Sequence, residues 1–377
     1  VMRTTFTPTL SFMPSGYASG RGETMPEHLP MIAIVRNKKQ KMNRLLAACI
    51  AMLLGACGAD SNPPLPKLTL DPERVAVVGI SSGAIMAQQM HLAFSDHLRG
   101  AALLSGPPYQ CAEGSLERAL GYCLKAAGAT PDMEKLAAEI TARAQRGDLA
   151  PLHGLRGDHV LVTHGKNDTL VPESMSRASL ALYQALPEAS SMTLRFDGDG
   201  AFAHLWPTTS AGGDCQTTAT PYIGNCNRDY AGEVMQAMFG DAPAAAPAQA
   251  GGRLSAFDQD AYRPDGEDAL LDSAGLLYQP ARCAQGERCG LLIAFHGCEQ
   301  NRAALGETFA RDNGLNRWAD VYGTVVLYPQ TRSSYLPLNP KACWDWWGYS
   351  GANYDTRSGV QLRAVANMAA ALGAPLQ

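Results

Sequence analysis

The chain has 377 residues, of which 46% are hydrophobic and 18% are charged, and its formal net charge is −4. This length can form one large α/β domain or two smaller ones, and the composition is that of a folded soluble protein. Without residues 1–56 the chain would carry 24 Lys and Arg against 33 Asp and Glu, a net charge near −9. That balance argues against nucleic acids and anionic polymers as partners, and it leaves neutral substrates open.

The first 56 residues have the pattern of an export signal. A basic run at 36–44 precedes the apolar run Leu45–Leu54, which is followed by the small residues of LGAC. These are the three parts of a secretory signal peptide, and the apolar run is too short to span a membrane. LGAC is similar to a bacterial lipobox, so we expect lipidation of Cys57 and anchoring at the outer membrane, with plain secretion as the alternative. Met42 would start such a signal, which makes residues 1–41 an upstream extension.

Cysteine usage agrees with export. Eight of the ten cysteines remain once Cys49 and Cys57 are assigned to the signal and the lipid anchor. An even number in an exported chain indicates four disulfides, although eight cysteines allow about 105 pairings. The sequence has no C-x-x-C pair and no histidine cluster, so we expect neither a metal nor another cofactor.

Short β-branched runs alternate with helical stretches, which predicts an α/β fold with a mostly parallel sheet and helices on both faces. The predicted strands are Val75–Gly79, Ala101–Leu104, Val160–His164, Met192–Phe196, Leu291–His296 and Thr324–Tyr328. The predicted helices are Ser82–Phe94, Met133–Ala144, Pro172–Ala185, Tyr230–Met238, Arg302–Tyr322 and Val360–Leu372. The low-complexity sequence GDAPAAAPAQAGG at 240–252 predicts a linker.

One segment between a strand and a helix matches a nucleophile motif. Gly79-Ile80-Ser81-Ser82-Gly83 is the only G-x-S-x-G in the chain. In an α/β hydrolase this pattern forms the elbow that exposes a catalytic serine above the sheet. Taken alone, the pattern is equally typical of a glycine-rich turn with incidental serines.

Later strands supply the partners that such a serine needs. The order of an α/β hydrolase is Ser, Asp, His, and Asp168 and His204 each follow a later predicted strand. His204 would take the proton of Ser81 and return it to the leaving group, while Asp168 would orient the imidazole. Nearby alternatives for the catalytic histidine and aspartate are His164, Asp197 and Asp199. The two aspartates are also typical turn residues, which accounts for their presence beside His204 without a catalytic role.

An oxyanion hole requires two backbone amides, and the sequence places the second one unexpectedly late. Ser82 would supply one amide, as the residue after the nucleophile. The strand and His296-Gly297 turn that would present the Cys298 amide come far downstream of Ser81 rather than before it. A circular permutation explains this order, with the linker at 240–252 joining the ancestral ends. Residues 57–377 are therefore predicted to form a single circularly permuted α/β-hydrolase domain.

These motifs together resemble the polyhydroxybutyrate (PHB) depolymerases and the related feruloyl and acetylxylan esterases. The resemblance covers about residues 70–375, and the motif order is similar to that of the permuted, single-domain depolymerases. It rests on GISSGAIMA (79–87), SGPPYQCA (105–112), HGCEQ (296–300), RWADVYGTVVLYPQ (317–330) and CWDWW (343–347). It implies serine-hydrolase attack on esters of a (R)-3-hydroxybutyrate polymer or its oligomers. The alternatives are a feruloyl- or acetylxylan-type esterase, and a surface lipoprotein that binds without catalysis.

The resemblance also bears on the disulfides and on substrate attachment. Proximity along the chain pairs Cys111–Cys123, Cys215–Cys226 and Cys283–Cys289, which leaves Cys298–Cys343. The last two cysteines lie in motif loops that must meet near Ser81 if the resemblance holds. No substrate-binding module follows the catalytic region before Gln377, so we expect the catalytic face of a monomer to contact polymer. Candidates for that surface are Tyr109, Trp206 and Trp344, together with Trp346 and Trp347, for which core packing is the stronger expectation.

Overall fold

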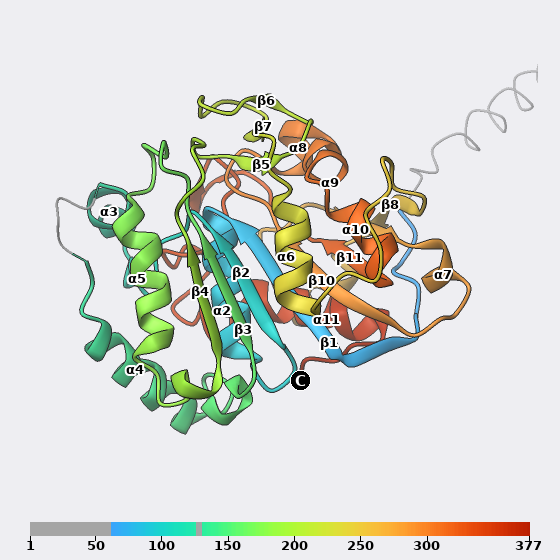
Figure 1. Cartoon of the computed structure of the whole chain (residues 1–377). Helices are drawn as coiled ribbons and strands as arrows, with labels where there is room; N and C mark the ends of the chain where they lie inside the picture. The colour runs from blue at the N-terminus through green and yellow to red at the C-terminus, as the bar shows by residue number, and fades with distance from the viewer. Residues whose placement is uncertain (1–61, 126–129) are drawn as a thin grey trace, which may run out of the picture. The chain divides into compact units, whose positions relative to one another are not determined.

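An eight-stranded sheet lies at the centre of the computed structural model, which describes residues 62–125 and 130–377 (Figure 1). The predicted signal peptide and Cys57 lie outside the described residues, so export and lipidation stay predictions. The first six strands in the spatial order are mutually parallel, and the two remaining pairings, β11 with β9 and β9 with β8, are antiparallel. In spatial order they are β4 (Thr193–Asp197), β3 (His159–Thr163), β2 (Gly100–Leu104), β1 (Leu70–Ile80), β10 (Cys289–Phe295), β11 (Thr324–Tyr328), β9 (Ala274–Gln279) and β8 (Arg253–Asp258).

Helices cover both faces of this sheet because its central strands are apolar on both sides. In β1, Val75 and Val77 belong to one core cluster, whereas Ala76 and Val78 belong to the other. Successive side chains of a strand point to opposite faces, so continuous apolar runs are buried twice. In Figure 1 α6 lies in front of the sheet, and α2 and α11 lie behind it. The longer helices are α2 (Ser82–Ala93), α4 (Met133–Arg146), α5 (Glu173–Gln184), α6 (Tyr230–Phe239), α10 (Leu315–Tyr322) and α11 (Val360–Leu372).

The predicted fold class is confirmed, and all six predicted strands are present with small shifts of their ends. The predicted helix 302–322 is wrong, because the chain there forms three helices. They are α8 (Arg302–Leu305), α9 (Thr308–Asp312) and α10, with breaks at Gly306 (φ 62°) and Gly314 (φ 84°). A left-handed backbone is open to glycine and ends a helix.

The hairpin of β8 and β9 was not predicted from the sequence. It begins directly after residues 240–252, which have neither helix nor strand, and the role of this segment as a linker stays a prediction. Two smaller sheets lie above the carboxyl ends of the central strands. One contains β5 (Trp206–Thr208), β7 (Ile223–Asn225) and β6 (Gly213–Asp214), and the other contains β12 (Ser334–Tyr335) and β13 (Leu338–Asn339).

The strand order brings two distant motifs together. Strands β1 and β10 are neighbours, with Gly79 opposite Phe295, although about 215 residues separate them. Ser81 follows β1, and the His296-Gly297 turn follows β10, so both motifs lie at the carboxyl edge of the sheet. Ligands bind in this position in open α/β sheets. The evolutionary permutation itself stays a prediction.

The four predicted disulfides are all formed, namely Cys111–Cys123, Cys215–Cys226, Cys283–Cys289 and Cys298–Cys343. None of the helices in the described part of the chain has the length and apolar character needed to cross a membrane.

Candidate active site

Ser81 has the backbone conformation of a nucleophile elbow. It follows β1 and precedes α2, with φ 57° and ψ −123°. A positive φ is uncommon for a residue other than glycine, and such strain is concentrated at functional sites. The flanking glycines make this turn possible, because a Cβ at Gly79 would lie 2.0 Å from the carbonyl oxygen of Gly83. A Cβ at Gly83 would lie 2.4 Å from the carbonyl oxygens of Phe295 and His296.

Asp168 and His204 form a buried pair. Asp168 Oδ2 lies 2.7 Å from His204 Nδ1, and both side chains are buried. Asp168 Oδ1 accepts hydrogen bonds from the backbone amides of Leu170 and Val171, each at 2.9 Å. Burial alone would raise the pKa of Asp168, but the hydrogen bond and charge of His204 and the Val171 amide outweigh it, so the pKa is lowered. The carboxylate therefore stays ionised beside the imidazole.

The alternative residues have other partners. His164 Nδ1 lies 2.9 Å from the hydroxyl of Ser176, and burial lowers the pKa of this histidine. Asp197 Oδ2 accepts a hydrogen bond from Arg228 at 2.7 Å, and Asp199 is an exposed residue paired with Lys166. Pairing with His204 is shown for Asp168 alone among the described carboxylates.

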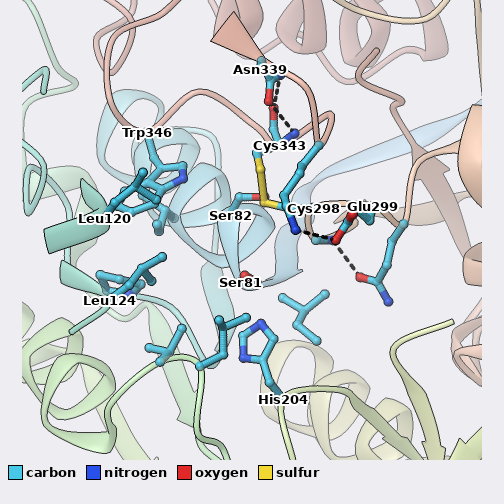
Figure 2. Close-up of a pocket in the computed structure, with 18 of the residues that line it drawn as sticks. Ser81, Ser82, Leu120, Leu124, His204, Cys298, Glu299, Asn339, Cys343 and Trp346 are labelled. Atoms are coloured by element: carbon cyan, nitrogen blue, oxygen red, sulfur yellow. Dashed lines mark hydrogen bonds and ion pairs between the residues drawn. A yellow bond between two sulfur atoms is a disulfide. The ribbon is translucent and has the colours of Figure 1, made fainter. Parts of the chain in front are cut away.

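A pocket of about 520 Å³ brings Ser81 and His204 to one surface (Figure 2). Ser82, Gly297 and Cys298 line it as well. A Cβ at Gly297 would lie 3.4 Å from the Cβ of Ser81, so the turn after β10 passes directly beside the nucleophile. The Ser82 and Cys298 amides are thus near the serine, as an oxyanion hole requires, and their role as its donors stays a prediction.

Hydrogen bonds hold the turn that carries Cys298. The Gly297 amide donates to Gln300 Oε1 at 2.8 Å, and Gln300 Nε2 donates to the carbonyl oxygen of Tyr222 at 3.0 Å. The disulfide to Cys343 fixes the same turn to the CWDWW loop. The Cys298 amide is therefore positioned from two sides.

Three aromatic residues proposed for the substrate surface are instead part of the core. Tyr109, Trp206 and Trp344 have exposed fractions of 0%, and none appears in the wall of the pocket as far as the structure describes it. The Tyr109 hydroxyl donates to the carbonyl oxygen of Asp355 at 3.0 Å, and Trp206 Nε1 donates to that of Asn313 at 2.8 Å. The Trp344 ring packs edge-on against a core phenylalanine with its centroid 5.0 Å away.

Trp346 and Trp347, for which core packing was the stronger expectation, are buried in a core cluster as expected, and they also line the pocket. The buried carboxylate of Asp345 explains this arrangement, because it accepts five hydrogen bonds from the residues that follow. Oδ1 accepts from the amides of Trp347, Gly348 and Tyr349, and Oδ2 accepts from the amide and hydroxyl of Ser350. These hydrogen bonds fix the backbone of the turn that carries the two tryptophans.

Sequence reasoning missed most of the apolar wall. Leu116 and Leu120 line the pocket from the segment that the Cys111–Cys123 disulfide closes, and Leu124 lines it directly after that segment. Their spacing of four residues is typical of one helical face, and this was the available signal. Further apolar lining residues are Ile80, Ile85, Pro107, Leu170, Val171, Leu338 and Pro340.

Exposed apolar side chains gather around the pocket. Leu120, Leu170 and Leu338 line it and are about half exposed, and Tyr335 and Leu336 extend from the β12–β13 hairpin with exposed fractions of 82% and 94%. These five are the exposed large hydrophobic residues of the described chain. We call them the apolar rim. Exposed apolar residues that gather near a pocket are candidates for an interaction surface.

The fold and the site define the protein as a carboxylic ester hydrolase of the α/β-hydrolase class. Residues 273–372 match the family model described as Esterase PHB depolymerase. A poly(3-hydroxybutyrate) depolymerase of Delftia acidovorans is 33% identical over 333 residues, which cover 86% of this chain and 65% of that relative. A polyhydroxybutyrate depolymerase of Talaromyces funiculosus is 32% identical over 319 residues, which cover 80% of this chain and 90% of that relative. The chain belongs to the PHB depolymerase family.

Solved structures agree with this assignment. The crystal structure of PHB depolymerase from Penicillium funiculosum superimposes with a TM-score of 0.74 at 28% identity, covering 83% of this chain and 99% of that one. A serine-to-alanine variant of a PHB depolymerase, complexed with an R3HB trimer, matches equally well.

Proposed function

We propose that the protein hydrolyses ester bonds of poly(3-hydroxybutyrate) or its oligomers through an acyl-enzyme on Ser81. The observation that carries the proposal is that the strained Ser81 and His204 line one pocket. His204 is hydrogen-bonded through Nδ1 to the buried carboxylate of Asp168. The names of the relatives and the trimer complex of a similar structure support the choice of polyester.

The proposed reaction has two steps. With the Nδ1–H of His204 donated to the Asp168 carboxylate, Nε2 carries no proton and can accept that of Ser81 as the serine oxygen attacks the ester carbonyl. The amides of Ser82 and Cys298 stabilise the oxyanion, and His204 then protonates the departing alkoxide. Water, deprotonated by the same histidine, attacks the acyl-enzyme and releases the acid product. Ser81 recovers its proton from His204.

The walls of the pocket suit an aliphatic polyester. Such a chain carries no charge along its length, and its methyl and methylene groups can contact the apolar lining. Binding would therefore leave no charge of the substrate buried without a partner. The apolar rim would contact the water-insoluble polymer around the pocket mouth, since burial of apolar surface favours this contact.

The test compares two adjacent serines. Ser81→Ala should abolish clearing of a PHB suspension. Ser82→Ala keeps its amide and should retain most activity, with a loss of about 1 kcal/mol in stability because the Trp344 amide loses the Ser82 hydroxyl as acceptor. Equal losses from both changes would contradict the assignment of the nucleophile. If the protein releases ferulate from a model ester and does not clear PHB, its substrate is a plant-cell-wall ester and not the polyester.

We also propose that the protein is exported and lipidated at Cys57. Four disulfides support an oxidising compartment. Detergent-phase partitioning and mass analysis of the N-terminus test the anchor. A mature N-terminus that is free and unmodified would contradict it.

A further inference from the structure

The pocket is chemically divided about the nucleophile. In Figure 2, Leu120, Leu124 and Trp346 lie to one side of Ser81, and Glu299 lies to the other side. Among the described residues of the wall, the charged side chains besides the catalytic histidine are Glu299 and Lys341. These two charged side chains form an ion pair with each other, at 3.0 Å, in a wall that is otherwise mostly apolar.

Two donors converge on one oxygen of Glu299. Lys341 Nζ and the Tyr222 hydroxyl both donate to Glu299 Oε2, each at 3.0 Å. The hydrogen bond from Lys341 is the largest cause that lowers the pKa of Glu299, so this carboxylate is ionised. The two donors therefore form a binding site for a carboxylate, which a side chain of the protein itself fills in this structure.

This ion pair can exchange with a ligand. The exposed fractions of the Lys341 and Glu299 side chains are 62% and 41%. Ion pairs so accessible to water contribute little to stability, so another carboxylate can replace Glu299 at small cost. A second hollow of about 390 Å³ shares Glu299, Pro340 and Lys341 with the main pocket, and therefore provides room beside Lys341.

The pair is connected through one short segment to the histidine that would protonate the departing alcohol. Cleavage of the polyester leaves the acyl part on Ser81, and the alcohol part carries the original carboxyl end of the chain. His204 protonates this alcohol, and the segment around Thr218 and Tyr222 connects the histidine to Glu299. Thr218 Oγ1 accepts from the His204 amide at 3.1 Å, and Tyr222 is hydrogen-bonded to Glu299.

We propose that Lys341, with Tyr222, binds the terminal carboxylate of a 3-hydroxybutyrate oligomer and so favours cleavage close to the acid end of the chain. The site rests on the proposed function and deepens it, because it selects among substrates of that reaction. Interior esters of the polymer have no charge nearby and do not use the site. Acid-ended oligomers do use it, and the enzyme therefore processes them to short acids in preference to capped chains.

The experiment compares the free acid of the (R)-3-hydroxybutyrate trimer with its methyl ester, which has the same esters and lacks the charge. The measured quantity is the ratio of kcat/KM for the acid to kcat/KM for the methyl ester. Lys341→Met should lower this ratio about tenfold, the effect of one charged hydrogen bond to a partly exposed partner. Glu299→Gln should raise the ratio, because it removes the competing carboxylate and its repulsion. High salt should lower the ratio in the parent protein and not in Lys341→Met.

Lys166→Met is the matched control. This lysine also forms an exposed ion pair, 3.3 Å from Asp199, and it does not appear among the described residues of the pocket wall. The control loses the same charge and should keep the parental ratio. A purely structural role of Lys341 would change both substrates equally and leave the ratio unchanged.

The possible failures are distinguishable. If the parent protein hydrolyses both trimers and Lys341→Met keeps the parental ratio, or Glu299→Gln lowers it, the carboxylate site is refuted and the proposed function stands. If the parent hydrolyses p-nitrophenyl butyrate and neither trimer, the polyester function fails and the carboxylate site fails with it.

Discussion

Replacement of both Cys298 and Cys343 by serine should lower kcat strongly while the protein remains folded. The bridge closes a segment with a sequence separation of 45 residues. Chain entropy assigns such a loop about 4 kcal/mol of stability, which is an upper value because measured effects often fall short. The double replacement leaves no free thiol that could form another disulfide.

Local contacts should keep both loops folded without the bridge. The Cys343 amide donates to Asn339 Oδ1, and Asn339 Nδ2 donates to the carbonyl oxygen of Cys343, each at 2.9 Å. The Glu299 amide donates to the carbonyl oxygen of Lys341 at 2.7 Å. The amide of residue 298, however, would lose its covalent attachment. Loss of an oxyanion donor costs roughly 10²–10³ in turnover, so partial displacement should cost about 10–100-fold in kcat.

The assay measures kcat and KM on p-nitrophenyl butyrate, and the midpoint of urea unfolding. Paired replacement of Cys283 and Cys289 is the control, because that bridge closes a separation of only 6 residues beside β10 and away from the pocket. Its loss should cost about 2 kcal/mol and leave kcat near the parental value. Parental turnover without the Cys298–Cys343 bridge, or an equal fall in kcat for both variants, would refute the reasoning.

Three further predictions follow from the site. Asp168→Asn should lower kcat about 10⁴-fold, because the asparagine stabilises the wrong tautomer of His204. Folding lowers the pKa of Asp168, so the ionised carboxylate stabilises the fold at pH values above its usual pKa of about 3.9, and this stabilisation is lost as the pH falls through the lowered pKa. The free energy of urea unfolding should therefore depend less on acid pH in the variant than in the parent. Asp345→Asn should raise KM for oligomers more than it changes kcat, because five hydrogen bonds to its carboxylate orient the tryptophan wall, and steady-state kinetics that show only a kcat loss would contradict this. Replacement of Tyr335 and Leu336 by serine should lower binding to PHB granules several-fold while hydrolysis of a soluble ester changes less, and a sedimentation assay with parental binding would exclude the rim as the contact surface.

The sheet and the Asp–His pair could be predicted because their signals are local. Each predicted strand is a short apolar run, and Ser81, Asp168 and His204 each follow such a run in the order typical of the fold. Their convergence needs no further information, because parallel strands place their carboxyl ends at one edge. The prediction that paired Cys298 with Cys343 is confirmed as well.

Other features depend on contacts that the local sequence does not report. The orientation of Trp344 is set by packing on β10, and that of Trp346 and Trp347 is set by the buried carboxylate of Asp345. All three tryptophans are buried, but only Trp346 and Trp347 among them appear in the described wall of the pocket, a difference that their shared sequence context does not reveal. The break at Gly306 could not be predicted either, because the residues around it keep a helical periodicity. A glycine can lie within a helix or end it, and only the positive φ of Gly306, which the sequence does not show, identifies the break.

The neighbouring positions of β1 and β10 determine when the enzyme can become active during synthesis. Ser81, Asp168 and His204 are all translated before residue 205, but the strand that pairs with the other side of β1 ends at Phe295. Until then β1, which is apolar on both faces, has an unpaired edge, and such edges promote aggregation. The nucleophile and the Asp–His pair are therefore made long before the strand and the His296-Gly297 turn that complete the pocket beside Ser81.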